Sequence, residues 1–369
     1  MSFYMRVVYL SRQFNHSGLA VFDALSQSDR FDVMAVVVPP VRDSQQSMRR
    51  LNRPLTAWLE KLRYWLDSAR TGARRLRFEE SILRRARREG IPVLEISSLK
   101  EETGWQHLEQ LKPDLIVIGG GWPELLPPEV VDLAPLGALN THPSLLPAYR
   151  GTDVHRWQIR DGVRVSGISV HYLDRDFDTG PVLGQVEVEI RPGDTPQDLS
   201  RRTSQAAGPL VLSVLDRIAR AAPQRVEVST QPAGGSAAGG SDLFPRWPWA
   251  DDDFIAIDPG GSAREVERLV LACSQESFRH DGPWIQIGSR QFVVRTAEIR
   301  APVAEVQPGT LVIRGGWPVL QCGDEAVILR RLQERGPVPM RSRSVSGRRF
   351  ARNVIGRSNY ISLTEGNGR

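Results

Sequence analysis

The N-terminal part of the chain alternates short apolar runs with stretches whose apolar residues recur at helical spacing. Residues 5–10 (MRVVYL) and 31–38 (FDVMAVVV) are largely apolar, which is typical of strands buried on both faces of a sheet. Residues 18–25 lie between them with helical spacing, and residues 113–118 (PDLIVI) form a further apolar run. A strand, a helix and a second strand in this order predict a βαβ unit, whose crossover joins parallel strands. The pattern therefore predicts an α/β, Rossmann-like domain with a mostly parallel sheet.

The pattern predicts that this first domain ends with a long helix. Residues 182–190 alternate as a strand does, and Thr195-Pro196-Gln197-Asp198 has the form of a helix N-terminal capping box. Apolar residues then recur at helical spacing as far as Ala222. The stretch PAGGSAAGG that follows is typical of a flexible linker. We therefore expect a first domain at 1–222 and a linker at 223–249.

The C-terminal part has the pattern of a small β-barrel. A helix is predicted at 262–273, and five short alternating segments separated by Gly and Pro follow it. They predict an OB-like domain at 250–340, followed by a loosely ordered basic tail at 341–369. The five predicted strands are 284–287, 291–297, 309–314, 319–322 and 326–332.

Composition adds little that discriminates between functions. The 369 residues carry 48 Lys and Arg against 43 Asp and Glu, a net charge of +5 that suits a polyanion, a phosphate-bearing small molecule or simply a solvated surface. No apolar run is long enough to span a membrane, so we expect a cytoplasmic protein without a membrane partner. The two cysteines lack metal-ligand spacing, and the acidic run 251–253 is more typical of a solvated turn, so no metal is expected.

Residues 137–180 contain the candidate catalytic side chains. An apolar run ends in Asn140-Thr141-His142, and a second one, 167–173, leads to Asp178. An amide N–H can donate to a developing oxyanion, an imidazole can accept a proton, and a carboxylate can fix the imidazole tautomer. Asn140, His142 and Asp178 are therefore the candidate catalytic residues for an acyl transfer.

The complete motif of residues 137–180 is more specific than these three residues alone. Asn-x-His-Pro-Ser-Leu-Leu-Pro-x-x-Arg-Gly, followed by His-x-x-x-x-x-x-Asp-x-Gly, resembles the signature of the formyltransferases that depend on 10-formyltetrahydrofolate. That family includes glycinamide ribonucleotide transformylase, methionyl-tRNA formyltransferase, amino-sugar formyltransferases and formyltetrahydrofolate deformylase. The resemblance implies N10-formyltetrahydrofolate as co-substrate and attack of an amine on its formyl group. Asn140 and His142 would then stabilise the oxyanion, with His142 also able to move the proton, and Asp178 would orient His142 or hold a water that relays the proton to N10.

The resemblance also implies binding residues. The loop that begins with Gly119-Gly120-Gly121 corresponds to one wall of the folate pocket, and three glycines also let the backbone approach a ligand closely. The turn 173–178 would cradle the pterin. The implied folate contacts are Trp122, Leu125, Leu126, Val131, Leu173, Asp174 and Asp176. The implied contacts to the acceptor are Ser144, Arg150, Gly151, Trp157 and His171, although His171 could equally be a packing residue.

The acceptor follows less directly from the resemblance. Methionyl-tRNA formyltransferases usually read Arg-Gly-Ala-Ala-Pro-Ile after the Leu-Pro loop, whereas this chain has Trp157 seven residues after Arg150 and a His171-Tyr172 strand. These features look more like the amino-sugar formyltransferases. We therefore expect a small-molecule amine acceptor, either a nucleotide-linked amino sugar or a natural-product amine. Methionyl-tRNA formyltransferase and formyltetrahydrofolate hydrolase remain the alternatives.

Residues 41–90 bear on the choice between a small-molecule amine and methionyl-tRNA as the acceptor. This Arg-rich insertion carries apolar residues at helical spacing, among them Trp58 and Trp65. Methionyl-tRNA formyltransferases have a basic loop at this point that enters the tRNA, so tRNA is a possible partner. An amphipathic helical insertion that packs on the domain, or on a second subunit in a homodimer, explains the apolar stripe better.

Overall fold

The structure is a computed structural model in which the chain forms two compact units. One unit comprises residues 1–151, 165–189 and 200–243, and the other comprises 152–164, 190–199 and 244–369. Within them the structure describes residues 4–13, 15–40, 81–228, 231, 243–248, 253–274, 282–335, 345–351 and 360–363. Residues 41–80 of the predicted insertion, most of the predicted linker and most of the predicted tail lie outside the described residues.

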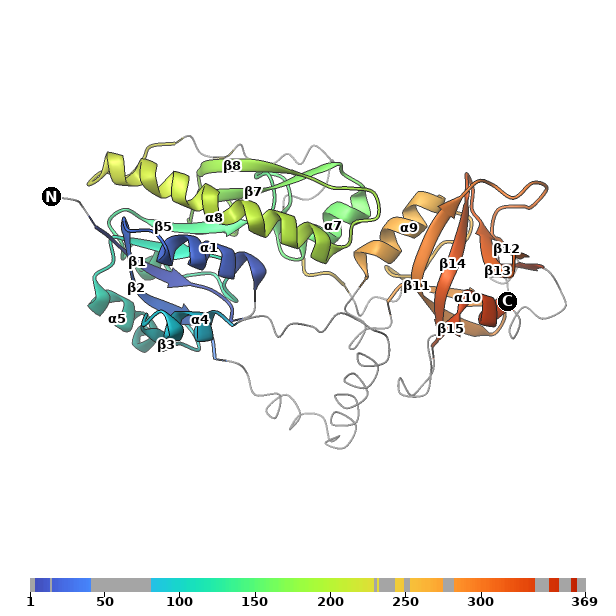
Figure 1. Cartoon of the computed structure of the whole chain (residues 1–369), viewed down its shortest axis with the longest axis horizontal. Helices are drawn as coiled ribbons and strands as arrows, with labels where there is room; N and C mark the ends of the chain where they lie inside the picture. Colours follow the sequence, from blue (N-terminus) through green and yellow to red (C-terminus); the bar gives the residue numbers. More distant parts are fainter. Residues whose placement is uncertain are drawn as a thin grey trace, which may run out of the picture. The chain divides into compact units, whose positions relative to one another are not determined.

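The first unit is built on a seven-stranded sheet with the order β3-β2-β1-β4-β5-β7-β8 (Figure 1). The pairings from β3 to β5 are parallel, while β7 runs antiparallel to both β5 and β8. The predicted α/β class with a mostly parallel sheet is therefore confirmed. The strands are β1 (Met5–Leu10), β2 (Phe31–Val38), β3 (Val93–Glu95), β4 (Leu115–Ile118), β5 (Ala138–His142), β7 (Val165–Tyr172) and β8 (Val182–Glu189).

Helices cover both faces of the central strands of this sheet, which is why β1 and β4 are apolar along nearly their whole length. In β1, Val7 and Tyr9 pack with α1 (His16–Ser26), α4 (Ile82–Arg88) and α8 (Pro196–Ala221), which Figure 1 shows over the sheet. Val8 and Leu10 point the other way and pack with α5 (Glu102–Leu111) and α6 (Pro128–Val131). Because side chains alternate between faces along a strand, the residues of β1 find apolar partners on both faces of the sheet.

The glycine-rich loop after β4 serves the packing of α1. A Cβ on Gly119 would lie 2.0 Å from the Tyr9 hydroxyl, and one on Gly120 would lie 2.5 Å from Asn15 Oδ1. Asn15 is the N-cap of α1, accepting from the Gly18 N–H and donating to the Gly120 carbonyl at 3.0 Å. Glycine is therefore needed at these two positions for packing within the protein, and the approach of a ligand to this loop stays a prediction.

The second unit contains an antiparallel, nearly closed barrel with the order β10-β11-β14-β13-β12-β16, which confirms the predicted OB-like domain. Helix α9 (Ala263–Ala272) begins at the Ser262 capping box and packs Val266 and Val270 into the barrel core. Helix α7 (Val154–Asp161) also belongs to this unit. The strands are β10 (Trp284–Ile287), β11 (Arg290–Arg300), β12 (Thr310–Arg314), β13 (Trp317–Gln321), β14 (Ala326–Glu334) and β16 (Tyr360–Ser362), while β15 (Val345–Ser346) pairs with β14 and leads into α10 (Gly347–Phe350).

Residues 222–228 and 231, which follow α8, contact the rest of the first unit. The Arg225 guanidinium donates to the carbonyls of Ala134 and Pro135, and Val226 and Val228 pack against the core. Gln231 hydrogen-bonds two backbone carbonyls of the loop that carries Asp178. Among the described helices, none has the length and apolar character needed to cross a bilayer.

Candidate functional site

The pairing of β5 with β7 brings three of the predicted polar residues to one face of the sheet. Asn140 pairs directly with His171 across the two antiparallel strands, and His142 pairs with Ser169. Residues two apart in a strand share a face, and so do directly opposed cross-strand partners. Asn140, His142 and His171 therefore lie together although His171 is 31 residues from Asn140 in the sequence.

Asp178 reaches this cluster from the loop between β7 and β8. Its carboxylate Oδ2 lies 3.3 Å from His142 Nδ1 and accepts the Gly151 N–H at 2.9 Å. Its Oδ1 accepts from Asn140 Nδ2 at 3.2 Å and lies 3.5 Å from His171 Nε2. The loop presents this carboxylate by placing Asp178 in the left-handed region, at φ 57°. The structure thus brings Asn140, His142, His171 and Asp178 into one hydrogen-bonded cluster.

The two nitrogens of His142 face different acceptors. Nε2 lies 2.7 Å from the Tyr149 carbonyl oxygen, which can only accept, so this nitrogen carries a proton. Nδ1 faces the Asp178 carboxylate, which also only accepts. Both contacts are satisfied at once only by the doubly protonated ring, so the geometry favours an imidazolium–carboxylate pair.

The electrostatics agree with this protonation state. Burial alone would lower the pKa of His142, but the negative charge and hydrogen bond of Asp178 outweigh it and raise that pKa. Burial likewise pushes the pKa of Asp178 upward, and the two histidines reverse this and hold it well below its usual range. His142 is 3% exposed and Asp178 is 9% exposed, so solvent does little to screen their attraction.

The Asn140 amide is oriented by two neighbours. Its Nδ2 donates one hydrogen to Asp178 Oδ1 and lies 3.2 Å from His171 Nε2. His171 Nδ1 lies 2.8 Å from the Tyr172 carbonyl oxygen, which can only accept, so Nδ1 carries a proton, and Nε2 lies between Asn140 Nδ2 at 3.2 Å and Asp178 Oδ1 at 3.5 Å. Because His171 is fully buried, the structure uses its ring to orient Asn140.

The predicted folate contacts form part of one apolar cluster. Leu126 is buried, and Trp122, Val131 and Leu173 pack half-buried against it, so they keep apolar surface available for a ligand. Leu125 is also half-buried, beside Leu126 in the same loop.

The two predicted acidic contacts in the turn differ in what they bind. Asp174 Oδ1 accepts from Thr179 Oγ1 at 2.6 Å and from the backbone N–H of Asp176 at 3.2 Å. Asp174 therefore shapes the turn itself. Asp176 is exposed at its tip.

The predicted acceptor contacts are less uniform. The Ser144 hydroxyl is fully buried and donates to the Ala148 carbonyl, so it helps to fix the conformation of the Pro-rich loop, residues 143–147. Gly151 contributes its N–H to Asp178, and the buried Arg150 donates to Gln231. Trp157 belongs to the second unit, where its ring packs among Phe244, Trp247 and Phe254 and its Nε1 donates to the Pro245 carbonyl. This packing leaves the Trp157 ring little surface for a substrate.

Sequence reasoning missed several participants in the site. The Tyr149 carbonyl and the Gly151 N–H are backbone groups, which leave no mark in a sequence. Gln231 lies 53 residues beyond Asp178 in a stretch whose composition is typical of a linker. None of these positions carries a signal that would have identified its role.

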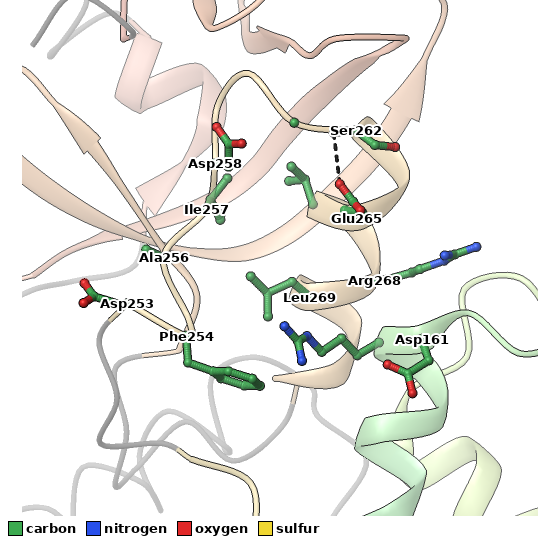
Figure 2. A pocket seen from close by; sticks show the side chains of 13 residues that line it. Asp161, Asp253, Phe254, Ala256, Ile257, Asp258, Ser262, Glu265, Arg268 and Leu269 are labelled. Carbon is green, nitrogen blue, oxygen red and sulfur yellow. Dashed lines mark hydrogen bonds between the residues drawn. The ribbon is translucent and has the colours of Figure 1, made fainter. Parts of the chain in front are cut away.

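A separate pocket of about 570 Å³ lies within the second unit, between α7, α9 and the segment before α9 (Figure 2). Acidic, basic and apolar side chains line it, and Arg160 lies 4.2 Å from the centre of the Phe254 ring. None of the residues predicted for catalysis or binding lines this pocket. The described part of the chain contains no group of three or more His, Cys, Asp or Glu side chains able to hold a metal ion.

Comparison with known proteins identifies the family. Residues 5–215, more than half of the chain, match the family model described as formyl transferase. Methionyl-tRNA formyltransferase of Chlorobium phaeovibrioides is 30% identical over 254 residues, covering 68% of this chain and 74% of that protein. The Thermus thermophilus methionyl-tRNA formyltransferase is 35% identical over 240 residues, covering 62% of this chain and 76% of that protein.

A solved structure supports the fold. HypX from Aquifex aeolicus in complex with tetrahydrofolic acid superposes with a TM-score of 0.56 at 16% identity, covering 95% of this chain and 47% of HypX. This chain thus spans about half the length of HypX. The match of the N-terminal unit to the family model, the two curated relatives and the shared fold all agree with the motif of residues 140–180. The chain belongs to the formyltransferases that take their formyl group from 10-formyltetrahydrofolate.

Proposed function

We propose that this enzyme transfers the formyl group of 10-formyltetrahydrofolate to the amine of methionyl-tRNA, with Asn140, His142 and Asp178 as its catalytic residues. The observation that carries the proposal is the buried cluster in which Asp178 contacts both His142 and Asn140. The acceptor is supported by the curated relatives, which are methionyl-tRNA formyltransferases of 30% and 35% identity.

His142 acts through its positive charge. Negative charge develops on the formyl oxygen as the amine attacks, and a preorganised positive group in a dry site stabilises it strongly. Both ring nitrogens are engaged, with the Tyr149 carbonyl and with Asp178, so the ring is fixed and its charge is maintained. A ring already protonated in this way is not free to accept a proton from the amine. The proton that the attacking nitrogen loses would instead pass to N10 as the bond between the formyl carbon and N10 breaks and tetrahydrofolate leaves.

Asn140 supplies the directional donor. Its amide hydrogens are shared between Asp178 and His171, and contacts of this kind rearrange when a substrate binds. Exchanging the His171 contact for the formyl oxygen keeps the amide anchored on Asp178. His171 then sets the starting orientation of the amide.

Asp178 keeps His142 charged. A carboxylate whose pKa lies well below the usual range is a weak base, so a role as proton acceptor is unfavourable. The direct 3.3 Å contact with His142 supports the orienting role over the holding of a relay water.

The apolar cluster after β4 fits the formyl donor. Tetrahydrofolate carries the activated formyl group and presents flat rings that need apolar surface. Trp122, Leu125, Val131 and Leu173 are half-buried and offer such surface. The turn 173–178 is held by its own hydrogen bonds and offers backbone groups for the polar edge of the pterin.

A small-molecule amine is the second candidate acceptor. The sequence departs from that usual in methionyl-tRNA formyltransferases at residues 152–157 (TDVHRW) and at the His171-Tyr172 strand. At both places it resembles the amino-sugar formyltransferases. This departure sits next to Gly151, which donates to the catalytic carboxylate.

An acceptor panel tests the proposal. Tetrahydrofolate release from 10-formyltetrahydrofolate is followed with methionyl-tRNA, nucleotide-linked amino sugars, hydroxyornithine-like amines and a control without amine. Turnover with methionyl-tRNA, with binding that weakens steeply as salt rises, is the expected result. Turnover only with a sugar or free amine contradicts the tRNA assignment and supports the second candidate. Formate release in the control without amine identifies a hydrolase.

A further inference from the structure

The loop that carries Asp178 is held through both the side chain and the backbone of this residue. The Asp178 carboxylate accepts from Gly151 N–H and from the Asn140 amide. The Asp178 backbone carbonyl accepts from Gln231 Nε2 at 3.1 Å. The same Nε2 donates to the Gly180 carbonyl at 2.6 Å, so one side chain spans the end of the loop.

Gln231 is itself anchored by a buried cation. Its Oε1 accepts from Arg150 Nη2 at 3.0 Å, and Arg150 is only 7% exposed. Arg150 directly precedes Gly151, whose N–H binds the Asp178 carboxylate. Arg150, Gln231 and the loop therefore close a ring of contacts in which the backbone and the side chain of Asp178 are both fixed.

The chemistry of this position is specific to an amide. Gln231 donates two hydrogens to carbonyl oxygens and accepts one from a guanidinium, which uses both ends of its side chain. A glutamate of the same size would accept from Arg150 but would set a carboxylate against two carbonyls. An alanine would leave the Arg150 Nη2 contact and both loop contacts unmade.

From this geometry we propose that Gln231 is a positioning residue for formyl transfer, which holds Asp178 against His142 and Asn140 and is itself held by Arg150. The inference rests on the proposed catalytic role of Asp178. It predicts that Gln231 acts on turnover through Asp178, without contacting either substrate.

The test is the kinetics of Gln231→Ala and Gln231→Glu in the full-length enzyme. We expect kcat to fall about 10- to 100-fold, the range that small misplacements of catalytic groups produce, while KM for 10-formyltetrahydrofolate stays within about twofold. Both variants should behave alike, because the lost donors and not the lost volume matter. Gln106→Ala, on the exposed face of α5, is the matched control and should keep wild-type kcat.

A double variant separates positioning from a general loss of structure. If Gln231 acts through Asp178, Gln231→Ala combined with Asp178→Asn should be no slower than Asp178→Asn alone. Further slowing by the same 10- to 100-fold in the double variant overturns the inference. Wild-type kcat in Gln231→Glu, together with an inactive Asp178→Asn, overturns it as well. Wild-type turnover in Asp178→Asn instead contradicts the proposed function, so the two failures are distinguishable.

Discussion

At the scale of single residues, the charge on His142 is decided by its two neighbours. The Tyr149 carbonyl and the Asp178 carboxylate are both acceptors, so the ring holds two protons although it is buried. Burial without these partners would favour the neutral form. These contacts hold His142 and Asp178 as an ion pair, which we propose to be the active form of the site.

Removal of either predicted oxyanion-stabilising group should slow the chemical step. We expect Asn140→Ala and His142→Ala to lower kcat by about 10²- to 10³-fold, the usual effect of losing one such group. Steady-state tetrahydrofolate release measures this, with His107→Ala on the exposed face of α5 as a control that keeps wild-type activity. Near-wild-type turnover in both site variants would contradict the assignment.

The pH dependence should report on the His142–Asp178 pair. Because the charged ring is the active form, kcat should fall as pH rises through the raised pKa of His142. Asp178→Asn removes the charge that raises this pKa and leaves the burial that lowers it. The falling limb of the residual activity should therefore move to lower pH, with His171 as the other titratable neighbour of Asp178.

The matching control for this profile is Asp29→Asn, whose side chain is exposed in the turn before β2. It should leave the limb where the wild-type enzyme has it. A limb that stays in place in Asp178→Asn, or an activity that rises across the same range, would show that the charged ring is not the active form.

At the scale of elements, the β7–β8 connection is the part of the fold that the site depends on most. The chain turns back after Tyr172 so that Gly180 passes directly under the end of β7. A Cβ on Gly180 would lie 1.9 Å from the Tyr172 carbonyl oxygen, which is backbone and cannot move aside cheaply. Small size at this position allows the loop to close.

Gly180→Ala should therefore impair function through the loop. We expect an overpacking cost of about 1–3 kcal/mol in unfolding free energy and a fall in kcat of about 10-fold or more. Denaturant unfolding and the release assay measure the two effects. Gly260→Ala, where the nearest atom lies 3.7 Å from the added Cβ, is the control expected to change neither. Unchanged kcat in Gly180→Ala would mean that the loop tolerates the shift.

At the scale of the whole molecule, the cluster of Asn140, His142 and Asp178 lies entirely within one of the two compact units. The second unit carries its own barrel core and its own pocket. Two units with separate cores can unfold separately, and a ligand stabilises only the unit that binds it.

Calorimetry with tetrahydrofolate should reveal this division. At about 100 times its Kd, the ligand adds about 2.7 kcal/mol to the stability of the unit that binds it. For a unit of this size that corresponds to a shift of about 5–10 °C in one of two unfolding transitions, with the other unchanged. Equal shifts of both transitions would contradict independent unfolding or place the folate elsewhere.

How far the sequence predicts this molecule depends on the range of the interactions involved. Local periodicity was sufficient for the α/β class, the five barrel strands β10 to β14 and helix α9, since these follow from which residues alternate or recur, but it missed β16, a barrel strand within the predicted tail. The same reasoning assigned the close approach of Gly119 and Gly120 to a ligand. The structure gives these two glycines a packing role that the sequence did not indicate, because Tyr9 and Asn15, more than 100 positions earlier, lie where a Cβ would be.

The sequence by itself determined the family and three catalytic candidates. The motif of residues 137–180 places Asn140, His142 and Asp178 at or near strand ends, with the spacing and neighbouring residues typical of that family. Only the tertiary structure decided how these three residues are arranged and which contacts they make. The protonation of His142 depends on the Tyr149 carbonyl, a backbone group that any residue could supply. The position of the Asp178 loop depends on a hydrogen bond from Gln231, which lies 53 positions further along the chain. A sequence records side-chain identity, whereas charge state and loop position follow from the atoms that folding brings together.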